Sequence, residues 1–288
     1  MKYGILANSF GKLPVQFIAE KTASAGFGSI QFALGGYGHV PLPFDTGLGR
    51  LNAGIAHYVA DAFIDCGVRI PVLGCYMDFV HKDDEVRRQN IARFKEHLRF
   101  AREFGAGAVV TETGKIASSW RTEGELPIET GYQRVRQAIE ELAEEAEKWG
   151  VFLGLEACQG HVIHNAELMQ RIIEEVPSSN IGVVMDPVNL LHAGNVQRQD
   201  EVLQDAFDRL GDRIIHAHAK DFNVSAEGAM QFCSPGTGNL NYSLFMSLLR
   251  RTKPCVHVTF ERTPAESIAA ALQFMSQLPS EVEVAARS

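Results

Sequence analysis

Short runs rich in Val, Ile and Leu alternate with amphipathic stretches along the whole 288-residue chain. This alternation is typical of parallel strands that are connected by crossover helices. Eight runs have the length of a strand, and a helical pattern follows each one. They are residues 3–7, 29–34, 69–76, 108–112, 151–156, 181–186, 214–220 and 255–261. Eight such units predict an α/β fold of the (β/α)8 TIM-barrel type.

The helix predictions are based on periodicity. Ile91, Phe94, Leu98, Ala101 and Phe104 lie at three- and four-residue steps, with Lys and Arg between them, which favours an amphipathic helix. The stretch 132–149 repeats the pattern, and the glycine that follows it is expected to end the helix. No shift in composition marks a boundary, so one domain over residues 1–288 is expected. The Gly- and Pro-rich segment 35–46 is predicted to be a rim loop, either a lid or a long connection.

Composition limits the partners of the chain. The formal net charge is -8 and the pI is about 5.7, so no net basic field would hold nucleic acid. Five cysteines without a Cys-x-x-Cys pair indicate reduced thiols rather than disulfides or a structural zinc site. No stretch has the character of a signal peptide or the length of a membrane span. The expectation is a cytoplasmic protein that contacts neither membrane nor nucleic acid.

Four residues of the kinds that bind metals lie at or near the ends of predicted strands. They are Glu156, Asp186, His218 and Glu261, at separations of 30, 32 and 43 residues, about one strand-helix unit each. In a (β/α)8 barrel the carboxyl ends of all strands meet on one face. Since side chains alternate along a strand, Glu156, His218 and Glu261 are also expected to face the barrel interior. The spacing therefore predicts one site built from four strand ends.

A lone carboxylate after a strand more often caps a helix or pairs with a basic residue. Three carboxylates on one rim, however, would repel one another and raise one another's pKa unless a cation lay among them. Oxygen ligands with one imidazole suit a hard or borderline divalent ion, with Mn²⁺ the first choice and Mg²⁺ or Co²⁺ as alternatives. Four protein ligands would leave two positions of an octahedral ion for a carbonyl and a neighbouring hydroxyl.

These residues, with the segments Asp186-Pro-Val-Asn189 and His216-Ala-His-Ala-Lys-Asp221, resemble the xylose-isomerase-like TIM-barrel superfamily of sugar isomerases and epimerases. The resemblance covers nearly the whole chain and includes a Gly-x-Gly segment, residues 235–242. It implies that Glu156, Asp186, His218 and Glu261 bind one metal ion. In the ketose 3-epimerases of this family the two metal-bound glutamates exchange a proton with the substrate through an enediolate. The resemblance thus gives Glu156 and Glu261 the catalytic role.

The chain departs from the ketose 3-epimerases at positions that hold their substrate. Asn189 stands where they have a His, and Val224 stands where they have an Arg. Ala157 and Cys158 replace a common Pro-His pair, with His161 a few residues further on. These departures leave the substrate open and make His161 and Asn189 candidate substrate-binding residues.

Further candidates come from position. Glu112, Gln31 and Tyr76 lie in or near strand ends, and Glu112 is expected either to bind sugar hydroxyls or to cap a helix. Lys220 resembles the His-x-Lys-Asp pattern of other family members, including dehydratases. It is predicted either to contact substrate, or to form a salt bridge with Asp221 or with the last metal-type glutamate.

The first functional hypothesis is a divalent-metal-dependent isomerase or epimerase that moves a proton next to the carbonyl of a small keto sugar. The alternative is a metal-dependent dehydratase or lyase acting on a keto sugar, a cyclitol or a 3-oxo-glycoside. An abasic-site endonuclease is disfavoured because relatives with that activity carry a larger set of metal ligands, and a binding protein without turnover is a further alternative. By resemblance, the protein is also predicted to be a homo-oligomer, either a dimer or a tetramer.

Overall fold

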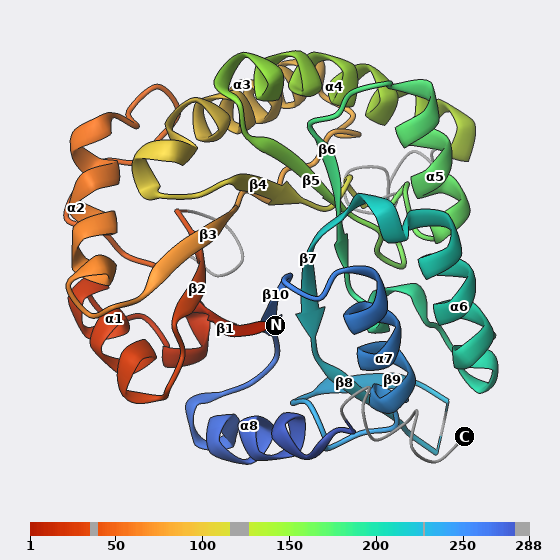
Figure 1. Cartoon of the computed structure of the whole chain (residues 1–288). Coiled ribbons are helices and arrows are strands. Elements are labelled where there is room, and N and C mark those ends of the chain that lie inside the picture. The colour runs from red at the N-terminus through yellow and green to blue at the C-terminus, as the bar shows by residue number, and fades with distance from the viewer. Residues whose placement is uncertain (35–39, 116–126, 227, 280–288) are drawn as a thin grey trace.

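Eight parallel strands close into a barrel in the computed structural model, which describes residues 1–34, 40–115, 127–226 and 228–279. The order around the barrel is β1-β10-β7-β6-β5-β4-β3-β2 (Figure 1). The strands are β1 (Lys2–Leu6), β2 (Ser29–Ala33), β3 (Arg69–Gly74), β4 (Ala108–Thr111), β5 (Phe152–Glu156), β6 (Ile181–Met185), β7 (Ile214–Ala219) and β10 (His257–Phe260). This architecture confirms the predicted (β/α)8 barrel.

A ring of helices surrounds the barrel, and each of its strands is followed by one helix (Figure 1). They are α1 (Val15–Ser24), α2 (Ala53–Ile64), α3 (Asp84–Phe100), α4 (Ile128–Trp149), α5 (Ala166–Glu175), α6 (Gln199–Leu210), α7 (Tyr242–Thr252) and α8 (Ile268–Gln277). The expected stop after α4 is confirmed, since Gly150 has the left-handed backbone, φ 65°, that glycine adopts without strain. No helix in the described ranges combines the length and the apolar character needed to cross a bilayer.

Several strands end one or two residues earlier than the sequence predicts. As a result Glu112, Asp186, Lys220 and Glu261 lie just beyond strand ends, where the backbone turns into a loop. The structure also contains a short antiparallel hairpin, β8 (Asp221–Val224) with β9 (Met230–Cys233), which the sequence analysis did not predict. Its strands have four residues each and are largely exposed at one end, so they lack a clear hydrophobic pattern.

The rim segment predicted at 35–46 is only partly described, because residues 35–39 lie outside the described ranges. The remainder begins at Val40, which is fully buried. Its backbone N–H donates to the carbonyl oxygen of Ala33 at the end of β2 (3.2 Å). The described part is therefore anchored to the strand that precedes it.

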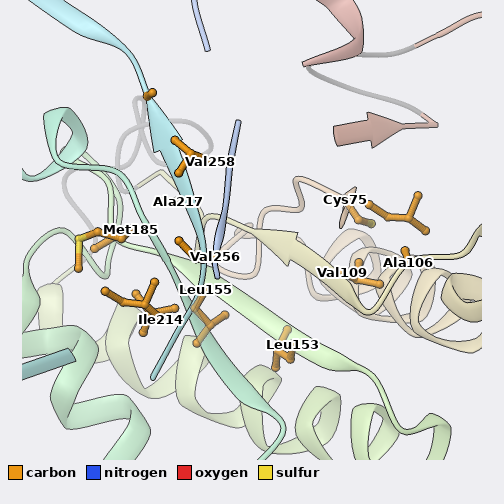
Figure 2. Packing of buried hydrophobic residues seen from close by; sticks show 14 of the residues in the cluster. Cys75, Ala106, Val109, Leu153, Leu155, Met185, Ile214, Ala217, Val256 and Val258 are labelled. Atoms are coloured by element: carbon orange, nitrogen blue, oxygen red, sulfur yellow. The ribbon is translucent and has the colours of Figure 1, made fainter. Parts of the chain in front are cut away.

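Apolar side chains on the outer face of the barrel pack against the helices. Figure 2 shows Leu153 and Leu155 of β5 on the helix side of the strand, and Met185, Ile214 and Ala217 belong to the same cluster. Burial of such side chains from water is the main contribution that holds the helices to the barrel. The alternate residues of these strands are left to face the interior.

The interior of the barrel has an apolar lower layer of Val72, Ala108, Val110 and Val184, packed by Ile215. Ile215 reaches this layer because a register shift, with Val183 opposite Ile214 and Val184 opposite His216, inserts it as an extra residue in β7. Gly154 and Gly182 make the room for it. A Cβ on Gly182 would lie 2.6 Å from Ile215 Cγ2. We call this layer the barrel floor.

Candidate metal centre

The four strand-end residues come together above the barrel floor. Each of Glu156, Asp186, His218 and Glu261 offers a ligand atom within 4.8 Å of the others, and all four are buried. Glu156 ends β5, Asp186 follows β6, His218 lies in β7 and Glu261 follows β10. The arrangement is the convergence that the spacing predicted, so this buried cluster could bind a divalent metal ion.

His218 presents a defined nitrogen to the three carboxylates. Its Nδ1 lies 3.4 Å from Glu156 Oε1 and 3.7 Å from both Asp186 Oδ2 and Glu261 Oε2. Its Nε2 is 2.9 Å from Gln31 Oε1, an acceptor, so Nε2 carries the ring proton and donates it. When a cation replaces the proton on Nδ1, the lone pair of this nitrogen faces the carboxylates, as a metal ligand requires.

Gln31 and Tyr76 support this orientation. The amide Nε2 of Gln31 donates to the phenol oxygen of Tyr76 (2.7 Å), which fixes the amide so that its oxygen faces His218. The sequence had nominated both residues only as polar rim positions. The parity of Gln31 in β2 was the available signal, because it places the side chain in the interior beside the imidazole.

The charges of the cluster perturb its titratable groups. Burial alone would lower the pKa of His218, but the carboxylates of Glu156 and Asp186 outweigh it and raise this pKa to about 10. Burial raises the pKa of Glu156. Burial would also raise the pKa of Asp186, yet the ammonium of Lys220 and the imidazole of His218 hold it well below its usual range. The carboxylates of Glu156, Asp186 and Glu261 thus create a site that strongly favours positive charge.

Lys220 and Asn189 brace the carboxylates from the side. Lys220 Nζ lies 3.0 Å from Asp186 Oδ2 and 3.1 Å from Glu261 Oε2, and it donates to Asn189 Oδ1 (2.7 Å). Asn189 Nδ2 in turn donates to Glu156 Oε1 (2.6 Å). Of the two salt-bridge partners considered for Lys220, the structure therefore has the glutamate.

Asp221, the other salt-bridge partner considered for Lys220, binds backbone N–H groups instead. Its carboxylate accepts the backbone N–H groups of Phe222, Gly236, Gly238 and Leu240 at 2.8–3.1 Å. A Cβ on Gly238 would lie 2.4 Å from Asp221 Oδ1, so the glycine allows the backbone to approach. The Gly-x-Gly segment is thus folded around a carboxylate at the start of β8.

One buried atom shows that the donor set fits a cation. Asp186 Oδ1 accepts the N–H groups of Val188 and Asn189 (2.9 and 3.2 Å), whereas Asp186 Oδ2 makes no hydrogen bond of good geometry among the described residues and lies 3.0 Å from Lys220 Nζ and 3.7 Å from His218 Nδ1. This second oxygen is on the side of His218 and Lys220. A buried carboxylate oxygen is stabilised by a nearby positive charge, and three carboxylates with one imidazole are a donor set that suits one divalent ion.

A second group of similar residue types lies near the same end of the barrel. Glu112, Cys158 and His161 also bring ligand atoms within 4.8 Å of one another. Glu112 follows β4, and the other two lie in the loop after β5. Cys158 is half-buried.

The chain belongs to the xylose isomerase-like TIM barrel family, whose model matches residues 19–278. A curated relative, the uncharacterized protein MJ1311 of Methanocaldococcus jannaschii, is 26% identical over 174 residues, which are 59% of this chain and 55% of that protein. The chain thus spans about half the length of this relative.

Solved structures extend the likeness over nearly all of the chain. A D-tagatose 3-epimerase-like protein has a TM-score of 0.76 at 19% identity, covering 96% of this chain and 97% of that one. The IOLI protein with a bound zinc atom has a TM-score of 0.74 at 18% identity, covering 96% and 98%. The 3-keto-D-glucoside 4-epimerase YcjR of E. coli has a TM-score of 0.73 at 17% identity, covering 96% and 99%. At these identities the structures share the fold.

Proposed function

We propose that this protein is a divalent-metal-dependent isomerase or epimerase that moves a proton next to the carbonyl of a small keto sugar or sugar derivative. The observation that carries the proposal is the pair Glu156 and Glu261, which flank His218 Nδ1 at 3.4 and 3.7 Å. Their strands are separated in the barrel by β6 and β7. The two carboxylates therefore approach the same point from different sides.

The metal would be held by Glu156, Asp186, His218 and Glu261. When bound, such an ion polarises a carbonyl and a neighbouring hydroxyl and so makes the adjoining C–H bond more acidic. Mn²⁺ is our first choice, with Mg²⁺ or Co²⁺ as alternatives. The zinc in one similar structure makes Zn²⁺ a useful comparison.

The two glutamates would then act as base and acid. One carboxylate removes the proton from the carbon beside the carbonyl, and the other returns a proton to the opposite face, which inverts that centre. A positioned carboxylate typically contributes about 10²–10⁴-fold to such a step. Among the remaining candidates we propose Glu112 and His161 as substrate contacts, and Asn189 and Lys220 as contacts that also hold the carboxylates in place.

The test is solvent exchange in deuterium oxide with Mn²⁺-loaded protein and a panel of keto sugars. Wild-type protein should incorporate deuterium at the carbon beside the carbonyl, and chelation followed by addition of Mn²⁺ should remove and restore this exchange. Glu156→Gln and Glu261→Gln should each lower the rate at least about a hundredfold. Glu167→Gln, at an exposed position in α5, is the matched control. Normal exchange in both active-site variants, or full exchange by metal-free protein, would contradict the proposal.

A second candidate, a dehydratase or lyase on a keto sugar, cyclitol or 3-oxo-glycoside, is favoured by one observation. The buried ammonium of Lys220 lies 3.1 Å from Glu261 Oε2, so an acid stands beside a proposed base and could protonate a leaving hydroxyl. One similar structure is a 3-keto-D-glucoside 4-epimerase, which makes 3-oxo-glycosides a reasonable part of the panel. Product masses distinguish the two, because isomerisation conserves the mass of the substrate and elimination does not.

A further inference from the structure

The loops that follow β4 and β5 are fastened to each other beside the metal centre. Lys115 and His161 form an antiparallel bridge, and the N–H of Val162 donates to the carbonyl oxygen of Gly114 (3.2 Å). The N–H of Ile163 donates to Thr113 Oγ1 (3.0 Å). These contacts hold the backbone of His161 in place independently of its side chain.

The same contacts define which nitrogen of His161 carries its proton. Gly114 N–H donates to His161 Nδ1 (3.2 Å), so Nδ1 is the acceptor and Nε2 is the donor in the neutral ring. Burial lowers the pKa of His161, which keeps the ring neutral. Its side chain is 4% exposed, and Nε2 is buried without a hydrogen-bond partner among the described residues. Among residues 1–34, 40–115, 127–226 and 228–279, this buried donor therefore has no acceptor at hydrogen-bond distance.

A carboxylate acceptor lies next to this donor. Glu112 Oε2 is 3.5 Å from His161 Nε2, which is longer than a good hydrogen bond, and the Glu112 side chain is 29% exposed at the barrel mouth. A group that accepts from His161 and donates to Glu112 would satisfy both. A hydroxyl does this, because its oxygen accepts while its proton is donated.

We propose that Glu112 and His161 together bind a single hydroxyl of the substrate, away from the carbon at which the proton moves. The inference rests on the proposed function and narrows it: the substrate is a polyhydroxylated chain or ring that reaches from the metal centre to this pair. Specificity for that hydroxyl follows, since a substrate without it leaves a buried N–H and a carboxylate unpaired.

Cys158 places the two regions next to each other. Its thiol belongs to the group with Glu112 and His161. Cys158 is also only two residues after Glu156 in the chain, so the loop that carries His161 starts directly at the candidate metal centre.

A second metal ion is the competing occupant of Glu112, Cys158 and His161. A metal on His161 Nε2 requires that nitrogen to be unprotonated, which would move the ring proton to Nδ1, opposite the donating N–H of Gly114. Two donors would then face each other. The fixed ring proton therefore favours a hydroxyl over a cation.

The experiment follows the imidazole nitrogens of His161 by ¹⁵N NMR in Mg²⁺-loaded protein, with D-fructose, D-tagatose, D-psicose and their monodeoxy analogues as probes. At least one sugar should shift the Nε2–H signal of His161. Removal of one particular hydroxyl should weaken its binding about ten- to a hundredfold. Glu112→Gln and His161→Phe should each weaken binding of the parent sugar by a similar factor. Both variants should also bind the parent sugar and the deoxy analogue that lacks this hydroxyl with equal affinity.

His164→Phe is the matched control, because His164 lies in the same loop with its Nδ1 at the carbonyl oxygen of Val162 (3.2 Å). It should bind the sugars as the wild type does. Glu112→Gln keeps the proposal testable if His161→Phe does not fold, since Glu112 is partly exposed. The proposal is overturned if no sugar moves the His161 signal, or if the variants still discriminate. Binding of two Zn²⁺ ions per chain, with the second lost in His161→Phe, also overturns it.

Deuterium exchange separates this inference from the proposed function. Sugar-dependent shifts of His161 without exchange would remove the proposed reaction and leave the hydroxyl site intact. Deuterium exchange without any sugar-dependent shift at His161 would remove the hydroxyl site and leave the proposed reaction intact.

Discussion

Two groups of acidic and imidazole side chains stand at the same end of the barrel, and they differ in which atoms face inward. At the candidate metal centre three carboxylates converge on Nδ1 of His218, so these four groups are all acceptors once Nδ1 has lost its proton to a bound cation. Beside it, His161 turns a protonated nitrogen toward Glu112. The first group is suited to bind a cation. The second is suited to bind a group that both accepts and donates a hydrogen bond.

Residue type alone therefore does not define the chemistry of a site. In both groups a hydrogen bond on the far side of the imidazole decides its role: Gln31 accepts from His218, whereas Gly114 donates to His161. The partner of the outer nitrogen sets the tautomer and hence the chemistry of the inner one. Four substitutions test this difference between the two groups.

Lys220→Met should have the largest effect on the metal-free protein. It leaves Asp186 and Glu261 without the ammonium that lies 3.0–3.1 Å from their oxygens. Breaking a buried ion pair in this way typically destabilises a protein by about 3–5 kcal/mol. Thermal unfolding should show a large loss without metal and a smaller loss with Mn²⁺, because the ion replaces the missing charge. An equal loss of stability with and without Mn²⁺ would show that the ion does not replace the charge of Lys220. A loss of turnover that the loss of stability does not explain would indicate that Lys220 contacts the substrate.

Asp186→Asn should weaken Mn²⁺ binding at least about a hundredfold, since it removes a charge from the cluster and keeps the shape of the side chain. Glu112→Gln, the same kind of change in the neighbouring group, should leave Mn²⁺ affinity within about twofold. Isothermal titration of both variants measures the contrast directly. Equal losses in the two variants would mean that the groups act as one metal site.

Gln31→Leu should weaken Mn²⁺ binding about ten- to a hundredfold, the usual effect of removing a hydrogen bond that orients a metal-binding histidine. Gln16→Leu, on the exposed face of α1, is the control. Unchanged affinity in Gln31→Leu would show that packing alone orients His218.

Thr113→Val should have the smallest effect, a loss of about 1–3 kcal/mol of unfolding free energy, because it leaves the N–H of Ile163 without its acceptor. It should leave Mn²⁺ affinity unchanged and reduce the discrimination among deoxy sugars, because Thr113 helps to hold the loop that carries His161. Retained discrimination at lower stability would show that His161 is positioned without the fastened loops.

The fold was predictable because it rests on repeated local patterns. The periodicity of the stretch 132–149 and the glycine after it predicted α4 to within four residues at its start. The extra residue at Ile215 could not be foreseen, since a bulge depends on the register with β6 and on the space left by Gly154 and Gly182. The β8–β9 hairpin was missed because strands of four residues carry too little pattern.

The metal-type residues were predictable from strand-end spacing, and their proximity follows from the closed barrel. The roles of their neighbours were not. Asn189 bridges Glu156 and Lys220, a geometry that depends on the short turn after β6. The tautomers of His161 and His218 depend on partners 47 and 187 residues away, which no local pattern reveals.

The barrel floor limits how a small molecule can enter and leave the site. Ile215 and its apolar neighbours fill the space beneath the carboxylates. A small molecule that reaches the carboxylates from the loop side therefore has to leave from the loop side as well. Substrate and product would therefore exclude each other, and accumulated product should act as a simple competitor for entry.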